Sequence, residues 1–424
     1  MSRKNQYQSH FLGAAISGLV FLALLVPAIL SGAPVKHPLT YAETVLHSFA
    51  GTPKDGAVPY ASLVVDSANN VYGTTYYGGT SSTGTIFRLT SKGLENLYSF
   101  PSTNGSSAAS LSADGKGNFY GTASANNSGG LSYGTVFKVT AKGQVTILHS
   151  FQGIDGLSPA AGVVIDSNGN LYGTTQEGGN IRDCFGLGCG LVFEMSPPAP
   201  GKTKWTEKVI YAFTGKSDGA SPSAGLMFDV AGNLYGTTTY GGDLAACPGT
   251  YGDAGCGVVF KLTHSGSTWQ ESVLYTFTNG VDGGFPQYGS LVQDTQGNLY
   301  GTTYAGGADG LGTVFKVNQS GQETVVYSFT GQNGDGLFPF GGVILDAQGN
   351  TYGTTSQGGS GFGIVYSVSA SGAETILHTF VGTSGSDGAY PSDSLVFDLA
   401  GDLYGTTEGG GKFGSGTVFK LTPQ

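Results

Sequence analysis

Asp166-Ser167-Asn168-Gly169-Asn170-Leu171-Tyr172-Gly173-Thr174-Thr175 is one of seven close copies of the same stretch. The tyrosines of the copies are Tyr72, Tyr120, Tyr172, Tyr235, Tyr300, Tyr352 and Tyr404, which gives a period of about 50 residues. A period of this length is typical of repeat architectures, in which each repeat forms one structural unit. The rest of the chain is therefore compared repeat by repeat.

The repeated stretch has the features of a β-hairpin. An apolar run ends at Asp166, whose carboxylate can accept hydrogen bonds from backbone N–H groups two residues further on. Gly169 then supplies the positive φ that closes the turn, and the first repeat has Asn69 there, which also tolerates positive φ. A calcium loop is the alternative interpretation, but only this copy resembles one and the oxygen-rich twelve-residue loop is missing.

Each repeat contains four short runs typical of β-strands, designated A to D. In the first repeat these runs are residues 63–65, 71–75, 84–89 and 96–100. The runs are rich in β-branched and aromatic residues and are bounded by Gly, Asn and Ser. Four antiparallel strands per period match a propeller blade, so the sequence predicts an all-β protein.

The strand count predicts how the ring closes. Runs A, B and C each occur seven times, in repeats that begin near residues 61, 109, 161, 224, 289, 341 and 393. The first D run, residues 44–49, precedes any A run. We therefore expect a seven-bladed β-propeller over residues 43–424, whose last blade joins this N-terminal strand to three C-terminal strands (1+3). Pairing with residues 416–421 would cover an apolar sheet edge.

Composition limits the classes of partner. The chain has 424 residues, a net charge of −10, 11% charged residues and 74 glycines. Nucleic acids and anionic lipids are bound through basic surfaces, so neither is expected as a partner. A soluble, extracytoplasmic monomer is expected.

Residues 1–42 are expected to form an export signal or an N-terminal membrane anchor, followed by a linker. Arg3 and Lys4 precede an apolar run at residues 11–30, and small residues follow at 31–33. Pro34 disfavours cleavage directly after Ala33, and the apolar run is long enough to span a bilayer. A secreted or periplasmic product and a protein tethered to the membrane at the cell surface both stay open.

The four cysteines fit an exported protein. Cys184 and Cys189 lie in one loop, and Cys247 and Cys256 lie in the equivalent loop of the next repeat. Four cysteines allow three pairings, and we expect the two local disulfides, each closing a long insertion before a strand. A zinc site is the alternative, but the spacings do not match paired zinc knuckles.

Histidines and aspartates give little support for catalysis. His47, His149 and His378 occupy a strand D position that is tyrosine in other repeats, so a structural role is expected. Six D-to-A loops carry an Asp-Gly pair, at Asp55, Asp155, Asp218, Asp282, Asp335 and Asp387. A ring of these carboxylates could hold calcium, whereas Asp-Gly near a proline is also ordinary turn chemistry. On the turn interpretation no cofactor is expected.

Strand parity places the long D-to-A and B-to-C loops on one face, here called the loop face. Aromatic residues crowd this face in repeats one, five, six and seven, at Tyr60, Tyr76, Tyr77, Phe285, Tyr288, Tyr304, Phe338, Phe340 and Tyr390. Because blades seven and one are neighbours in a closed ring, we expect one continuous sector that stacks on sugars or anchors a protein partner. The alternative is that each aromatic side chain covers only its own loop.

Glu177 and Glu408 follow strand B in repeats three and seven, in what the sequence suggests are matching positions. They are the candidates for an acid and base pair. Three functions are therefore considered: a non-catalytic propeller that binds a saccharide or protein on the loop face, a secreted carbohydrate-active hydrolase or lyase, and a surface structural or adhesion protein. The first is favoured.

The motifs as a set resemble the GloVer tandem repeat of exported, "choice-of-anchor" bacterial proteins. The match covers about residues 43–422 and includes Asp155-Gly156-Leu157-Ser158-Pro159, Gly-Asn-Leu-Tyr-Gly-Thr-Thr and Gly-Thr-Val-Phe. The second repeat departs from the pattern, with Asn104-Gly105, no proline, and Ala123 in place of the second Thr. The resemblance implies an exported repeat protein and implies no activity.

Overall fold

The computed structural model describes residues 40–424 except 52, 54, 102–105, 125–132, 250–253, 267 and 383–386. Its contacts divide the chain into two compact units, Met1–His37 and Pro38–Gln424. The expected export signal or anchor lies outside the described residues, apart from residues 40–42, and so does Asn104-Gly105. Within the described part, no helix has the length and apolar character needed to cross a membrane.

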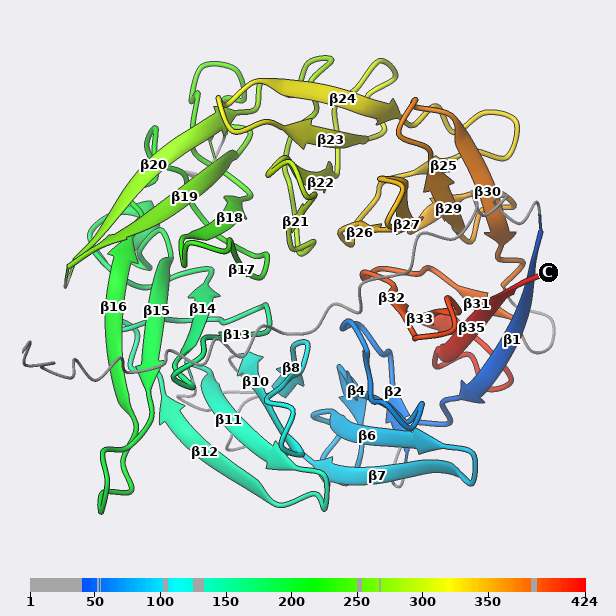
Figure 1. The fold of residues 1–424 in the computed structure, drawn as a ribbon, viewed down its shortest axis with the longest axis horizontal. Coiled ribbons are helices and arrows are strands. Elements are labelled where there is room, and N and C mark those ends of the chain that lie inside the picture. The colour runs from blue at the N-terminus through cyan, green and yellow to red at the C-terminus, as the bar shows by residue number, and fades with distance from the viewer. Residues whose placement is uncertain are drawn as a thin grey trace, which may run out of the picture. The chain divides into compact units, whose positions relative to one another are not determined.

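The second unit is a ring of seven antiparallel sheets, one for each repeat (Figure 1). Strand A lies innermost in each sheet and strand B pairs with it. The A strands are β3 (Val64–Val65), β9 (Ser112–Ala113), β13 (Val164–Ile165), β17 (Met227–Phe228), β21 (Val292–Gln293), β26 (Ile344–Leu345) and β32 (Val396–Phe397). The B strands are β4 (Val71–Thr75), β10 (Asn118–Ser124), β14 (Leu171–Thr175), β18 (Leu234–Thr238), β22 (Leu299–Thr303), β27 (Thr351–Thr355) and β33 (Leu403–Thr407).

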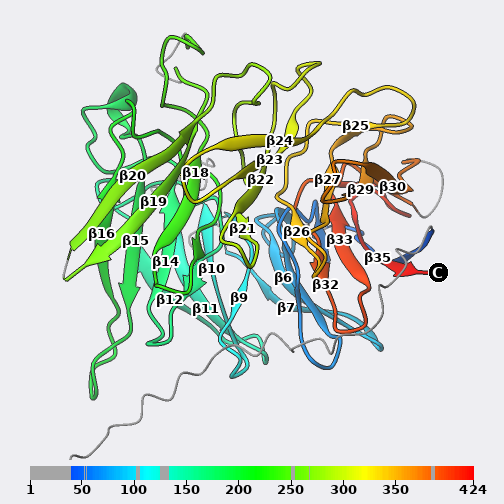
Figure 2. The same cartoon turned by 45° about the horizontal axis from the view of Figure 1, so that its top comes forward.

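Strands C and D complete each blade towards the outside of the ring (Figures 1 and 2). The C strands are β6 (Thr85–Thr90), β11 (Thr135–Thr140), β15 (Leu191–Ser196), β19 (Val258–Ser265), β23 (Thr313–Val317), β29 (Ile364–Val368) and β35 (Thr417–Pro423). The D strands are β7 (Gly93–Ser99), β12 (Val145–Ser150), β16 (Thr206–Ala212), β20 (Thr268–Thr276), β24 (Glu323–Ser328), β30 (Glu374–Thr379) and β1 (Tyr41–Ser48). Blade two also carries β8 (Ser106–Ala108), which pairs with β10.

The ring closes as the strand count predicted. β1 is antiparallel to β35, with Tyr41 opposite Pro423 and Ser48 opposite Thr417, in a sheet of order β1-β35-β33-β32. The first and last described strands therefore lie side by side (Figure 1). The predicted all-β, seven-bladed propeller with a 1+3 last blade is confirmed.

The repeated stretch forms the predicted turn. The Asp66 carboxylate accepts hydrogen bonds from the Ala68 and Asn70 amides, at 2.9 Å each, and from the Asn70 side chain. Burial alone would raise the pKa of Asp66, but these hydrogen bonds outweigh it and hold the pKa below its ordinary value. The other six repeats place the same Asp in the same turn.

The two threonines of the repeat have separate tasks. In five blades the first bonds the next blade, as in Thr174 to the Ala224 carbonyl at 3.0 Å, whereas Thr237 of blade four has no hydrogen-bond partner among the described residues. The second holds its own B-to-C loop, as in Thr175 to the Glu177 carbonyl at 2.7 Å. The motif therefore connects blade to blade and positions the loop face.

The core lies between neighbouring blades. In every gap, the phenylalanine that ends strand D packs edge-on against a strand C aromatic ring of the next blade, with ring centroids 5.0–5.4 Å apart. The gap between blades seven and one has the same pair, Phe49 and Phe87, at 5.3 Å. The closing gap is therefore packed like the other six.

Candidate functional site

In six blades the described D-to-A and B-to-C loops of the loop face pair with each other. Three blades form short ribbons, β2 (Gly56–Ala57) with β5 (Tyr77–Gly78), β25 (Gly336–Leu337) with β28 (Gln357–Gly358), and β31 (Gly388–Ala389) with β34 (Gly409–Gly410). Blades three, four and five form single bridges at the same place. Rigid loops can hold side chains in fixed positions for binding.

Backbone strain is stored at the same place in six loops. The residue before the loop proline has a positive φ of 54–61° although it is never glycine, and the six are Val58, Ser158, Ser221, Phe285, Phe338 and Tyr390. Each donates its N–H to a carbonyl in the preceding blade's B-to-C loop, as Phe338 does to Leu311 at 2.9 Å. Strain of this kind persists only where the surroundings enforce it, and it concentrates at functional surfaces.

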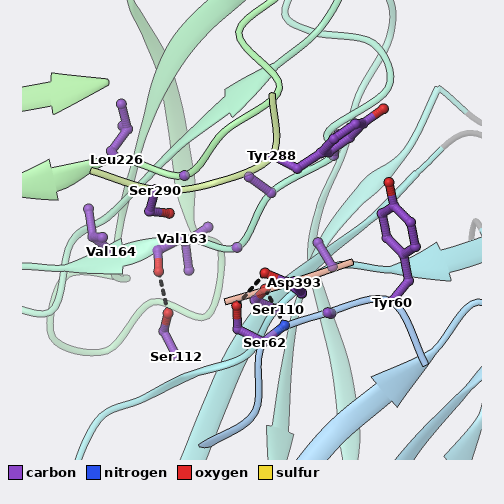
Figure 3. A pocket seen from close by; sticks show the side chains of 16 residues that line it. Tyr60, Ser62, Ser110, Ser112, Val163, Val164, Leu226, Tyr288, Ser290 and Asp393 are labelled. Carbon is purple, nitrogen blue, oxygen red and sulfur yellow. Dashed lines mark hydrogen bonds between the residues drawn. The ribbon is translucent and has the colours of Figure 1, made fainter. Parts of the chain in front are cut away.

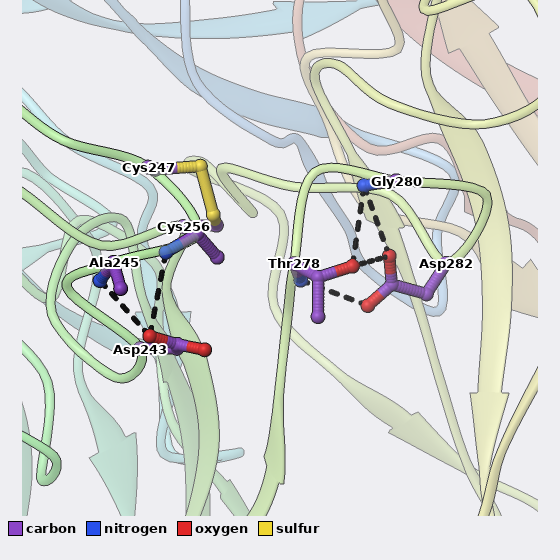
Figure 4. Close-up of a disulfide and its surroundings, with 8 residues drawn as sticks. Asp243, Ala245, Cys247, Cys256, Thr278, Gly280 and Asp282 are labelled. Carbon is purple, nitrogen blue, oxygen red and sulfur yellow. Dashed lines mark hydrogen bonds between the residues drawn. A yellow bond between two sulfur atoms is a disulfide. The ribbon is translucent and has the colours of Figure 1, made fainter.

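Both expected disulfides are present. Cys184 pairs with Cys189 beside the short 3-10 helix η1 (Cys184–Gly186), and Cys247 pairs with Cys256 (Figure 4). Each closes a B-to-C insertion on the loop face. No free cysteine remains, and the two disulfides indicate an oxidising, extracytoplasmic environment.

Seven of the nine predicted aromatic residues form one connected set of ring contacts, here called the axial aromatic cluster. Tyr60 of blade one contacts Tyr288 of blade five and Phe340 of blade six, with centroids 5.7 and 6.0 Å apart. The remaining members join through pairs, Tyr288–Phe340, Tyr304–Phe340, Tyr304–Phe338, Tyr60–Tyr76 and Tyr76–Tyr77. Tyr76 and Tyr77 are the exposed end, with 38% and 53% of their surface accessible.

The predicted continuous sector is not what forms. Blades one and five are not neighbours, so the Tyr60–Tyr288 contact crosses the ring. Tyr390 of blade seven contacts Phe362 at 5.7 Å, and Phe285 contacts Tyr240 at 6.0 Å. Among the described residues neither ring contacts a ring of the axial aromatic cluster, although Phe285 lines a separate pocket together with Tyr304. The sequence could not predict the contact across the ring, because the distance between opposite loops depends on how far each loop extends towards the axis.

A cavity of about 180 Å³ lies at the starts of the A strands, and Tyr60 and Tyr288 line its edge (Figure 3). Small residues and hydroxyl groups make up most of its wall, including Ser62, Ser110 and Ser290. We call it the axial pocket. Asp393 is the one charged residue among its lining residues.

Asp393 is held in a fixed position. Its Oδ1 accepts a hydrogen bond from the Ser62 hydroxyl at 2.7 Å (Figure 3) and another from the Ser394 amide at 2.6 Å. Burial raises the pKa of Asp393 to about 6, and these hydrogen bonds oppose the rise. The carboxylate is therefore mostly ionised at neutral pH.

Sequence reasoning missed Asp393, although a signal was present. The first residue of the A segment is alanine in repeats one to four, glycine in repeats five and six, and aspartate only in repeat seven. Aligning the repeats at this position would have identified the exception.

Glu177 and Glu408 do not occupy matching positions. The backbone N–H of Glu408 donates to the Tyr390 carbonyl, and in blade three the equivalent bond is made by Gln176, which donates to the Ser158 carbonyl. Gln176 therefore matches Glu408. Glu177 is the next residue along the chain and forms a β-bridge with Leu157. Successive residues of an extended chain point to opposite sides, so the two side chains differ in direction. The carboxyl of Glu408 lies near Tyr60, whose pKa is raised by burial and by nearby Tyr288, Glu408 and Asp393. No hydrogen bond joins Glu177 to Glu408 within the described residues.

The six loop aspartates do not meet at the axis. Each bonds the His or Tyr of the strand D that leads into its loop, at 2.9–3.3 Å, as in Asp155 to His149 and Asp282 to Tyr275. Most also accept backbone amides of their own loop, as Asp282 does from Thr278 and Gly280 (Figure 4). Both His and Tyr present a polar ring group to the Asp, which explains their exchange between repeats.

A glutamate from the next blade approaches five of these aspartates. The inter-blade carboxyl pairs are Glu43–Asp387, Glu207–Asp155, Glu271–Asp218, Glu323–Asp282 and Glu374–Asp335. In all five, the buried Oε1 of the glutamate has no hydrogen-bond partner.

His149, Asp155 and Glu207 lie with their ligand atoms within 4.8 Å of one another, the one group of potential metal ligands among the described residues. Since three of the other four pairs have Tyr in place of His, carboxyl pairing explains the repeated arrangement better than metal binding.

Fold and site together define a seven-bladed propeller with an aromatic cluster beside a carboxylate-bearing axial pocket. The chain belongs to the Gloeobacter/Verrucomicrobia repeat family, whose model matches residues 35–251 and 247–424. No curated protein has significant sequence similarity to the chain.

Several solved structures are similar to this chain. One is a gluconolactonase from Xanthomonas campestris, with 12% identity, a TM-score of 0.44, and coverage of 92% of this chain and 91% of that one. Another is a putative oxidoreductase (glucose dehydrogenase) from Thermus thermophilus, with 15% identity, a TM-score of 0.44, and coverage of 90% and 100%. A luciferin-regenerating enzyme has 13% identity, a TM-score of 0.44, and coverage of 90% and 95%.

Proposed function

We propose that this protein is an exported, non-catalytic propeller that binds a saccharide through the loop face. The observation that carries the proposal is the axial aromatic cluster, in which rings from three blades adjoin a polar pocket and end in the exposed Tyr76 and Tyr77. Aromatic rings offer apolar faces to sugar rings, and tyrosine adds a hydroxyl group at the edge. The pocket supplies hydroxyl groups for orientation, as ligand sites generally do.

Export rests on two features. The apolar N-terminal run preceded by Arg3 and Lys4 has the order of a secretory signal, and the disulfides need an oxidising compartment. Secretion, periplasmic retention and tethering through residues 11–30 are distinguished by fractionating cells and sequencing the N-terminus of the mature protein.

The binding proposal is tested by titrating the purified protein with a panel of soluble polysaccharides, using calorimetry. Tyr77→Ala removes an exposed ring of the cluster, and we expect affinity to fall roughly tenfold or more. Phe413→Ala is the matched control, because Phe413 is also 53% exposed and lies in a B-to-C loop outside the cluster. Equal affinities for the two variants would contradict the proposal.

The hydrolase alternative is tested on the same ligands. We expect the wild-type protein to release no sugar product. The double variant with alanine at Glu177 and Glu408 should therefore be as inactive as the wild-type protein. Product release by the wild-type protein that disappears in the double variant would establish the enzyme instead.

A further inference from the structure

The axial pocket contains one carboxyl group, that of Asp393, and no basic side chain beside it. The residues that line it include no Lys, Arg or His. The ion pairs of the described residues join Asp55, Asp155, Asp387, Glu95 and Asp402 to basic groups and leave Asp393 out. Asp393 is partly buried and has no basic partner, so its carboxylate is suited to a cation supplied by a ligand.

The surroundings favour an organic cation. Rings of Tyr60 and Tyr288 line the pocket, and aromatic faces attract ammonium groups. The carboxyl group of Glu408 lies near Tyr60, which places a second acidic group near the same edge. The aromatic rings and the Glu408 carboxyl group therefore both favour a cation in the pocket, as Asp393 does.

The size of the pocket limits what can enter. In another protein, a cavity of ~150 Å³ holds one benzene ring, and the axial pocket has about 180 Å³. A single six-membered sugar ring is of a size that this pocket can accommodate. Hydroxyl groups of Ser62, Ser110 and Ser290 in the wall can exchange hydrogen bonds with sugar hydroxyls.

We propose that the axial pocket binds the ammonium group of an amino sugar, with Asp393 as its ion-pair partner. This inference rests on the proposed saccharide binding and names the class of saccharide. The remaining sugar units of an oligomer would extend towards the exposed Tyr76 and Tyr77.

The test compares glucosamine oligomers with N-acetylated oligomers of equal length, which keep the ring and lose the charge. We expect the wild-type protein to bind the charged form roughly tenfold or more tightly. Asp393→Asn should abolish this preference. Its side-chain oxygen can still accept the bonds from Ser62 and Ser394, so the variant should fold, as circular dichroism will check. Asp309→Asn is the matched control, because Asp309 is an exposed carboxylate on the same face and outside the pocket.

A pH titration of the wild-type protein gives a test without substitution. Burial raises the pKa of Asp393 to about 6, so affinity for a glucosamine oligomer whose amines are trimethylated, and therefore charged at every pH, should fall as pH drops from 7 to 5. The N-acetylated oligomer should show no such loss.

The outcomes separate this inference from the proposed function. Equal, Tyr77-dependent binding of both oligomers would overturn the ammonium site and leave saccharide binding intact. Binding of neither oligomer, nor of any polysaccharide, would overturn both. Asp393-dependent binding of a lysine peptide, but not of its acetyl-lysine form or of amino sugars, would retain the ammonium site and reassign it to a protein partner. Asp393-dependent binding that requires calcium would contradict the inference.

Discussion

Glycine in the Gly-Thr-Thr motif is required by a neighbouring ring rather than by backbone conformation. A Cβ added to Gly173 would lie 2.5 Å from Cζ of Phe193, and the equivalent glycines of the other repeats face the same strand C ring. Gly169 differs, because its φ is +82° and nothing lies within 4 Å of an added Cβ. The two glycines of one repeat thus have different physical roles.

Gly173→Ala is therefore expected to lower the free energy of unfolding by roughly 1–3 kcal/mol, because the ring or the strand must shift. Urea denaturation followed by fluorescence measures the change. Gly169→Asn is the control and should alter stability by less than about 0.5 kcal/mol, since Asn69 holds this position in the first repeat with a φ of 58°. A Gly173→Ala variant as stable as the wild type would contradict the packing explanation.

At the scale of elements, the inter-blade carboxyl pairs predict an unusual pH dependence. Burial, aided by the facing aspartate, raises the pKa of Glu207, Glu271, Glu323 and Glu374 to about 7. The polar groups that face them are Asp155 with His149, Asp218 with Tyr211, Asp282 with Tyr275, and Asp335 with Tyr327. Within each pair, a protonated glutamate avoids repulsion by the aspartate.

The direction of the effect follows from proton linkage. A folded-state pKa above the unfolded value means that the folded protein binds more protons between about pH 4.5 and 7, so stability falls as pH rises through that window. The lowered pKa values of Asp55 and Asp387 act only at lower pH. We expect the melting temperature to drop by several degrees from pH 5 to pH 8.

The combined variant Glu271→Gln and Glu323→Gln should flatten this dependence, because glutamine stays neutral throughout. Differential scanning calorimetry across the pH range measures it, with Glu95→Gln, an exposed glutamate, as control. A melting temperature that rises between pH 5 and pH 8 in the wild-type protein would show that the glutamates are already ionised in the fold.

For the whole molecule, closure depends on one gap between blades. Phe49 is fully buried between blades seven and one, as Phe100 is between blades one and two. Phe49→Ala and Phe100→Ala should therefore destabilise the protein by similar amounts, about 3–5 kcal/mol each, in chemical denaturation. A much smaller loss for Phe49→Ala would mean that the ring is readily opened at this gap.

Much of this architecture is readable from the sequence because it is local or repeated. The Asp66 turn needs only residues within one hairpin, and the early position of residues 44–49 determines the count of strands in the last blade. The two disulfides could be predicted from the sequence because the cysteines of each pair lie within one loop. The offset between Glu177 and Glu408 is local as well, because Glu177 lies two residues after Thr175 and Glu408 lies one residue after Thr407.

The sequence by itself determined the class of fold, the number of blades and the position of the closure, because hydrogen bonding and strand alternation act over a few residues and then repeat. Only the tertiary structure decided that Tyr60, Tyr288 and Phe340 meet across the ring and that Asp393 faces a pocket without a basic partner. The physical cause of both features is the closed ring of blades. Closing it brings loops more than 200 residues apart, such as those of Tyr60 and Tyr288, to one axis, and no local pattern of residues encodes that approach.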